Sequence, residues 1–206
     1  MKLHLGCGTK KLDGWVNVDS VKACQPDVVH DLSAPLPYAD QSADEIMAHG
    51  VLEHFDKYAR CTLMADWVRV LKVGGRLELG VPDFEKLLVK IKKFKAFDDF
   101  VDTLFGENLW ESKIYIGHFG NHKWGYSKQS LRDFLKRFGI EQVKVETQGL
   151  NIYFEGKKVR HLSTDELDQM MIYSHNNNFG AETNQVTLAT ARAKIKEFQG
   201  QSYAKK

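Results

Sequence analysis

Two glycines and an aspartate near the start of the chain have the spacing that points most directly to chemistry. In the stretch LHLGCGTKKLDGWVNVD, Gly6 and Gly8 follow a short apolar run and Asp19 ends a second one. Glycines after a first strand let the backbone approach a ligand closely, and an acid that ends the next strand can accept both hydroxyls of a ribose. The pattern therefore predicts a nucleotide-like ligand. The alternatives are a plain tight turn at Gly6 and Gly8, and an Asp19 that only caps a loop.

The segment between the glycines and the aspartate is too short for a dinucleotide site. A dinucleotide fingerprint needs a third glycine and a helix N-terminus to hold the pyrophosphate. A crossover between parallel strands usually takes about a dozen residues or more, and only one turn fits between Gly8 and Trp15. A ligand without a pyrophosphate has no need of that helix, and S-adenosylmethionine is such a ligand.

Three side chains are candidates for acid–base or orienting roles: His54 in LEHF, and His122 and Tyr126 in GHFGNHKWGYS. Histidine is the natural base at neutral pH. The alternatives are a histidine that packs within a helix and a loop whose aromatic residues anchor it to the sheet. His118 and His122 are four apart, but the glycines between and around them argue against a helix. No third ligand is evident, so we predict no metal site. Cys7 is predicted to be a packing residue rather than a nucleophile.

The elements that must position these residues alternate along the chain. Apolar and alternating runs predict strands at residues 3–5, 15–19, 27–32, 43–50, 74–82, 141–147 and 185–193. Helical spacing and caps predict helices over residues 51–72, from Asp83 onward, over 127–139, and from Ser163 to about His175. This alternation predicts an α/β sheet that is largely parallel, with its ligand beyond the carboxyl ends of the strands.

Composition narrows the class of protein. The chain has 206 residues, which fits a single domain over 1–206, and its net charge of +2 argues against a dedicated nucleic-acid or membrane-surface binder. Its three cysteines have no metal-ligand spacing and suggest a reducing compartment. The first residues, MKLHLGCG, lack the apolar stretch of a signal peptide, and no run is long enough to span a bilayer. We therefore expect a cytoplasmic protein.

Four stretches in order carry a resemblance to a known family: LHLGCG…GWVNVD, DLSAPLPYADQSADEIMAHGVLEHF, RVLKVGGRLELGVPD and HKWGYSKQSLRDFLKRFGI. Together they resemble the class I S-adenosylmethionine-dependent methyltransferases, closest to a small bacterial and viral branch with a shortened start. The resemblance implies a Rossmann-like seven-stranded sheet, mostly parallel, with an antiparallel last strand and helices on both faces. That last strand would be VTLATARA, beside VKVET.

The resemblance also implies which residues hold the cofactor, S-adenosylmethionine. Gly6 and Gly8, with Cys7 between them, would pass the methionine part and Asp19 would hold the ribose. Asp31 and Leu32 would meet the adenine, although Asp31 is as well explained as the cap of a turn at Ser33. The end of the fourth strand would line the methyl-donor side through Ala48, His49 and Gly50.

We therefore expect a methyltransferase whose acceptor is a small molecule, with a sugar or glycan suggested by the short start. The alternatives are a nicotinamide-dependent oxidoreductase and a non-catalytic module that only binds S-adenosylmethionine. Two segments, 83–126 and 149–184, are long enough to serve as lids. The acceptor is expected between HFGNHKWGY and the cofactor, with the segment from Tyr153 to His175 as a second wall.

Overall fold

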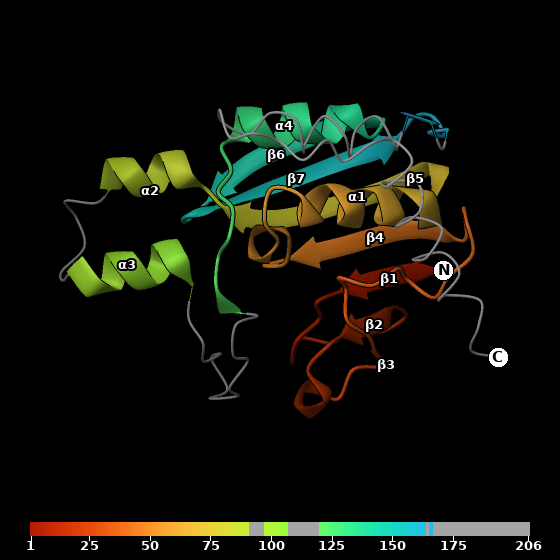
Figure 1. The fold of residues 1–206 in the computed structure, drawn as a ribbon, viewed down its shortest axis with the longest axis horizontal. Coiled ribbons are helices and arrows are strands. Elements are labelled where there is room, and N and C mark those ends of the chain that lie inside the picture. The colour runs from red at the N-terminus through yellow and green to blue at the C-terminus, as the bar shows by residue number, and fades with distance from the viewer. Residues whose placement is uncertain (91–96, 107–119, 164, 167–206) are drawn as a thin grey trace, which may run out of the picture.

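The computed structural model, which describes residues 1–90, 97–106, 120–163 and 165–166, contains one sheet of seven strands in the order β3-β2-β1-β4-β5-β7-β6 (Figure 1). The strands are β1 (Lys2–Leu5), β2 (Val16–Asp19), β3 (Val28–Val29), β4 (Ala43–His49), β5 (Leu71–Pro82), β6 (Ile140–Gln148) and β7 (Asn151–Lys158). The first five are parallel, and β7 is antiparallel to both of its neighbours. The predicted mostly parallel sheet with one antiparallel strand is confirmed.

The described residues form the helices α1 (Ala59–Val70), α2 (Phe84–Lys90), α3 (Phe97–Phe105) and α4 (Lys128–Arg137), with single 3-10 turns at η1 (Lys22–Cys24) and η2 (Leu52–His54). Two of the helices begin at caps that the sequence predicted, whereas α1 begins at Ala59, later than the predicted helix over residues 51–72. Ser127 and Ser130 form a capping box at the start of α4, and Gly139 follows the helix with a φ of +69°. Asp83 accepts the backbone N–H of Lys86 at 3.1 Å, as expected of an N-cap.

The strand next to β5 is not the one that the sequence suggested. Residues 151–158 form β7 and fill the position that we predicted for VTLATARA, and Gly149 opens the turn from β6 with a φ of +59°. Ile152 and Phe154 lie in the core and alternate with more exposed positions, as one buried face requires. The predicted lid over 149–184 is therefore wrong for these residues. VTLATARA (185–193) and the predicted helix beyond residue 166 lie outside the described residues.

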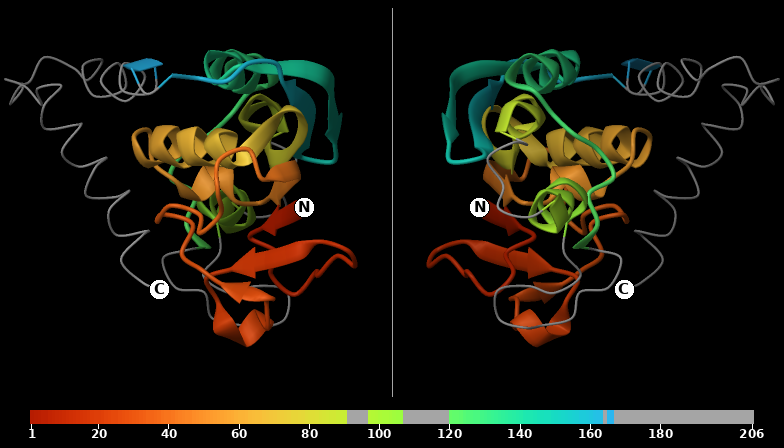
Figure 2. Two further views of the ribbon diagram at one scale, coloured as in Figure 1. Left: turned by 90° about the vertical axis from the view of Figure 1, so that its right-hand side faces the viewer. Right: turned by 90° about the vertical axis from the view of Figure 1, so that its left-hand side faces the viewer.

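Among the described residues, helices cover one face of the sheet rather than both. The two views in Figure 2 place α1 and α4 on the same side, and α2 and α3 lie beyond the carboxyl ends of the parallel strands (Figure 1). The covered face is apolar, whereas the opposite face carries a row of residues paired in register: His4, Met47, Glu78 and Glu155. Among the described residues, the crossovers that precede β4 contain no α-helix, and η1 is the one helical turn there.

The abbreviated crossover from β1 to β2 is confirmed, and hydrogen bonds from the side chain of Asn17 hold it in place. Asn17 accepts the backbone N–H of Leu12 at 2.8 Å and donates to the carbonyls of Leu12 and Trp15. It also donates to the carboxylate of Asp27 at 2.7 Å, which ties the crossover to the start of β3. β3 is correspondingly shorter than predicted, because Asp27 is held by Asn17 and Asp31 already begins a turn.

Candidate functional site

The glycine turn after β1 is held against the end of β2 by backbone groups. The N–H of Gly6 donates to the carbonyl of Val18 at 2.8 Å, and the N–H of Gly8 donates to Asp19 Oδ2 at 2.8 Å. Gly6 and Gly8 have φ values of +65° and +52°, in the left-handed region that favours glycine. The three residues singled out first in the sequence therefore form one unit.

Asp19 is a structural part of this unit as well as a candidate ligand. Its side chain is buried, and its second oxygen accepts the N–H of Val21 at 2.8 Å. Each oxygen of an ionised carboxylate has two acceptor sites, so both oxygens can accept one more hydrogen bond. That is the capacity that a ribose diol requires. Asp19 thus fits its predicted role while also shaping the turn.

The carboxyl end of β4 approaches the glycine turn so closely that only glycine fits there. A Cβ atom on Gly6 would lie 2.3 Å from Cγ2 of Val51, the residue before η2. Gly50, with a φ of +66°, turns the chain from β4 toward η2. Gly6 therefore leaves room for the side chain of Val51 at the edge where a ligand of this fold is expected.

Several predicted cofactor residues occupy other environments. Ala48 and Leu32 are in the hydrophobic core, so neither side chain is available to a ligand. Asp31 is exposed and accepts the N–H of Ser33 at 2.9 Å, which supports the turn-cap alternative. Cys7 is buried, and burial together with the charge of Asp19 raises the pKa of its thiol to about 12, which agrees with packing and not with a nucleophile.

His49 is turned toward the polar face of the sheet. Its ring packs edge-on against Tyr153 with centroids 5.3 Å apart, and its Nε2 lies 3.1 Å from Glu78 Oε1. Both aromatic residues line a small cavity of about 70 Å³ that also contacts Gly50, Glu53 and Gly80. Tyr153 is the part of the predicted second wall that reaches the site.

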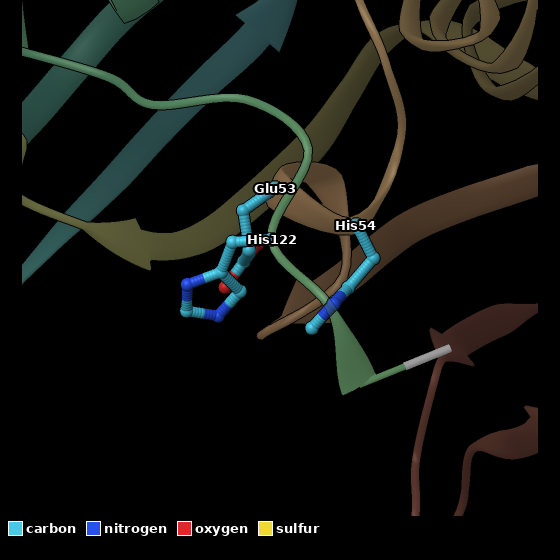
Figure 3. A group of neighbouring side chains, drawn as sticks. All are labelled: Glu53, His54 and His122. Carbon is cyan, nitrogen blue, oxygen red and sulfur yellow. The ribbon is translucent and has the colours of Figure 1, made fainter. Parts of the chain in front are cut away.

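Two of the three predicted catalytic residues come together, joined by a residue that sequence reasoning missed. The rings of His54 and His122 are 5.0 Å apart between centroids, and Glu53 points into the same gap (Figure 3). One ligand-type atom from each of the three side chains lies within 4.8 Å of the other two. The backbone causes this meeting, because the carbonyl of Glu53 accepts the N–H groups of Lys123 and Trp124 at 2.7 and 3.1 Å.

Burial keeps this cluster uncharged at neutral pH. Glu53 is only 2 % exposed, and burial raises the pKa of its carboxyl to about 8. Burial, with repulsion from His122, lowers the pKa of His54 to about 4, and burial also lowers the pKa of His122. Glu53 Oε2 is buried without a hydrogen-bond partner. Perturbed groups of this kind concentrate at functional sites.

Tyr126 is not part of this cluster, and its predicted catalytic role stays a prediction. It is 1 % exposed, it packs against Phe134, and burial raises its pKa above the usual range. Its backbone instead bridges to α2, where it accepts the N–H of Phe84 at 2.9 Å. These contacts are those expected of the alternative, an aromatic residue that anchors the loop.

A larger open cavity of about 500 Å³ adjoins the histidine cluster. Its walls are Phe84 and Leu88 from α2, Leu104 and Phe105 from α3, and residues 122–127 of the loop before α4. His122 lies in this wall, so the cavity and the histidine cluster share one side chain. The segment predicted to face an acceptor thus borders an apolar space.

Comparison with known proteins agrees with this fold. Residues 3–79 match the family model described as a methyltransferase domain. The fold is similar to a methyltransferase of Methanosarcina mazei described as S-adenosylmethionine-dependent, with 17% identity, a TM-score of 0.56, and coverage of 78% of this chain and 92% of that one. The 1,6-didemethyltoxoflavin-N1-methyltransferase of Burkholderia thailandensis, solved with 1,6-didemethyltoxoflavin and S-adenosylhomocysteine, has 14% identity and a TM-score of 0.52, with coverage of 77% of this chain and 71% of that one.

A third similar structure comes from a complex. It is the putative methyltransferase of Haloferax volcanii bound to the activator Trm112, with 12% identity, a TM-score of 0.55, and coverage of 79% of this chain and 83% of that one. No curated protein sequence matches the chain. Within the described residues, no helix has the length and apolar character needed to cross a membrane.

The strand order and the antiparallel β7 are those of the class I S-adenosylmethionine-dependent methyltransferase fold, and residues 3–79 match the model of a methyltransferase domain. S-adenosylmethionine is the cofactor that this fold and this match imply. The residues fit this cofactor, because the glycine turn brings backbone to the ligand edge and Asp19 keeps acceptor capacity for a diol.

Proposed function

We propose that the chain is an active enzyme that transfers the methyl group of S-adenosylmethionine to a small acceptor. The cofactor, when bound, supplies an activated methyl group, so the protein's task is to align the acceptor and exclude water. The observation that carries the proposal is the cluster of Glu53, His54 and His122, because His122 also lines the 500 Å³ cavity. A module that only bound the cofactor would have no use for buried, uncharged ionisable groups at that place.

Each part of the site has a role in this proposal. Gly6, Gly8 and Asp19 hold the cofactor, whereas the cavity between α2, α3 and the loop of residues 122–127 receives the acceptor. His122 lies in the cavity wall and orients the acceptor or takes up its proton. The acceptor class suggested by the short start, a sugar or glycan, is kept as part of the proposal.

Calorimetric titration with S-adenosylmethionine, S-adenosylhomocysteine and NAD⁺ tests the cofactor first. We expect binding of the two adenosyl compounds and none of NAD⁺. Release of S-adenosylhomocysteine is then measured with panels of sugars, oligosaccharides and small hydroxylated or amine-bearing compounds. Binding of NAD⁺ alone would contradict the proposal, and turnover by amines but not sugars would remove the glycan part.

Two variants make this test specific to the site. His122→Ala should lower the turnover number at least tenfold while cofactor affinity changes little, as expected when contacts to the acceptor or the transition state are lost. His161→Ala is the control, because this exposed histidine lies outside both the cluster and the cavity wall. Equal turnover by the His122→Ala variant and the parent would argue against this placement of the acceptor.

A further inference from the structure

Three side chains beyond the glycine turn have the composition and proximity of a metal site. Their ligand-type atoms lie within 4.8 Å of one another, and in Figure 3 the side chains converge on a common gap. Glu53 Oε2 is buried and has no hydrogen-bond partner, so a buried acceptor is left unsatisfied beside two imidazoles. We propose that Glu53, His54 and His122 bind a divalent metal ion, with Zn²⁺ as the favoured ion, and that the metal binds a hydroxyl oxygen of the acceptor.

Both imidazoles are already oriented as metal ligands are. His54 Nδ1 lies 3.1 Å from the carbonyl of Asn121, and His122 Nδ1 lies 3.2 Å from the carbonyl of Leu104. A carbonyl oxygen only accepts, so each Nδ1 carries the proton and each Nε2 keeps its lone pair. Metal-bound histidines almost always donate their other ring nitrogen to a carbonyl or a carboxylate in this way.

The backbone holds the two halves of the site together without a metal. Glu53 and His54 belong to η2 after β4, whereas His122 comes from the loop before α4. The carbonyl of Glu53 joins these segments by accepting two N–H groups from Lys123 and Trp124. A preformed site of this kind loses less conformational entropy when the ion binds.

The ligand set favours a particular kind of ion. Two imidazoles and one carboxylate suit Zn²⁺ and other divalent first-row ions better than Mg²⁺ or Ca²⁺. Bond lengths of about 2.0–2.2 Å bring tetrahedral ligands to within about 3.5 Å of one another, so binding should draw the side chains inward. Three protein ligands leave a coordination position for an exogenous oxygen, as in catalytic rather than structural zinc sites.

The chemistry of such an ion defines an acceptor class, and this step rests on the proposed methyltransferase function. A hydroxyl bound to the ion loses its proton more easily, and the proton passes to solvent. The acceptor oxygen then forms a bond to the methyl carbon as the carbon–sulfur bond breaks, and the electron pair of that bond stays on sulfur. The products are a methyl ether, S-adenosylhomocysteine and the released proton. The site therefore selects an alcohol or phenol oxygen over an amine.

Metal binding is tested on the whole chain after treatment with a chelator and its removal. We expect calorimetric titration with Zn²⁺ to show one equivalent bound, and Co²⁺ to give visible absorption bands of a four- or five-coordinate site. Glu53→Gln and His122→Ala should each weaken Zn²⁺ binding by tenfold or more. His161→Ala is the control, since this exposed histidine lies apart from the cluster. Absence of Zn²⁺ binding, or equal binding by the parent and both cluster variants, would overturn the proposal.

Cofactor titration in parallel separates this inference from the proposed function. If S-adenosylmethionine binds and Zn²⁺ does not, the metal site is wrong and the methyltransferase proposal stands. If Zn²⁺ binds at the cluster and S-adenosylmethionine does not, the proposed function fails while the metal site stands. If both bind, chelation should suppress methylation of hydroxyl acceptors and Zn²⁺ should restore it. Unchanged methylation after chelation would contradict the role assigned to the metal.

Discussion

Glu53 and His54 are adjacent in the chain and differ in exposure, but both side chains extend toward His122. Glu53 is buried and His54 half-buried, because the 3-10 turn of η2 places consecutive residues at different depths. Both nevertheless reach the gap occupied by His122 (Figure 3). A buried carboxyl costs stability unless something compensates for its desolvation. Its position between two imidazoles is therefore best explained by function rather than by packing.

Asp19→Ala should weaken S-adenosylmethionine binding at least tenfold. The change removes a charge-assisted hydrogen bond to the ribose, worth about 1.5–3 kcal/mol, and also releases the N–H groups of Gly8 and Val21. Asp31→Ala, at an exposed turn-capping position, should change the affinity much less. Calorimetry on both folded variants checks this. Equal losses from both variants would mean that Asp31 has the greater role that the sequence left open.

Gly6→Ala and Gly14→Ala form a matched pair that separates backbone strain from steric conflict. Both glycines have positive φ, but an added Cβ meets Val51 at 2.3 Å on Gly6 and no atom within 4 Å on Gly14. We expect Gly14→Ala to cost about 1–2 kcal/mol of stability, the usual penalty for a left-handed residue. Gly6→Ala should cost more and should also abolish cofactor binding.

Urea denaturation and calorimetry measure both quantities for the glycine pair. Unimpaired cofactor binding by the Gly6→Ala variant would show that β1 and β4 need not approach so closely for the cofactor to bind.

At the scale of elements, the first crossover shows how a side chain can replace a helix. Parallel strands usually need a longer connection, yet β1 and β2 are joined by residues 6–15 without one. Asn17 satisfies backbone groups of Leu12 and Trp15 and anchors them to Asp27. Asn17 holds the crossover, and Asp19 is the candidate ribose ligand. Because both lie on the short strand β2, a change at Asn17 should also affect the position of Asp19.

Asn17→Leu should destabilise the protein by about 2–4 kcal/mol, because several buried hydrogen bonds are lost and their backbone partners are left unpaired. The loss should be accompanied by faster hydrogen exchange of residues 6–15. Asn121→Leu, at an exposed position, is the comparison. If Asn17→Leu changed neither the urea midpoint nor the exchange of this segment, the crossover would have to be held by other contacts.

At the scale of the whole molecule, the two faces of the sheet differ, because one is apolar and the other is charged. α1 and α4 lie on one side of the sheet (Figure 2) and cover its apolar face. The other face carries linked charges such as Glu45, Arg76, Glu78 and Glu155. These ion pairs satisfy the charges of side chains that are only partly exposed. This polar face of the sheet therefore does not need an apolar layer packed against it. The site lies beyond the carboxyl edge, where both faces end.

The stability of the whole molecule should fall as the pH rises through the range in which Glu53 titrates. The unfolded chain ionises this carboxyl above its ordinary pKa of 4.5, whereas the folded protein keeps it protonated up to about pH 8. The unfolded state therefore binds fewer protons over this range, and the free energy of unfolding falls as pH increases. The lowered pKa of His54 has the opposite effect below pH 6.5, so the Glu53 effect is isolated between pH 6.5 and 8.

With chelator present, we expect the parent to lose about 2 kcal/mol of unfolding free energy between pH 6.5 and 8, and the Glu53→Gln variant to lose much less. Urea denaturation at a series of pH values measures both. Parallel pH profiles for the two proteins would show that Glu53 is already ionised in the folded state. Added Zn²⁺ should flatten the profile of the parent, because a bound ion keeps Glu53 ionised.

The sequence alone determined the local structures of this protein. The glycine turn, the strand that ends at Asp19, the caps at Asp83 and Ser127 and the stop at Gly139 were all predicted, because each depends on dihedral preferences and hydrogen bonds within a few residues. The capping box of Ser163 and Glu166 is present for the same reason. The shortened crossover follows from chain length alone.

Tertiary structure alone decided which distant segments meet. The strand at residues 151–158 was mistaken for a lid because its core-facing positions include Gly156 and Lys158, which interrupt the apolar alternation. Lys158 is buried because its amine donates to the carbonyls of Val68 and Leu71 at 2.7 Å, partners that no local pattern reveals. Glu53 joined His54 and His122, and Tyr126 entered the core, because backbone hydrogen bonds to the loop before α4 set their positions. Such contacts arise only when the chain folds, since they link residues that are far apart in sequence.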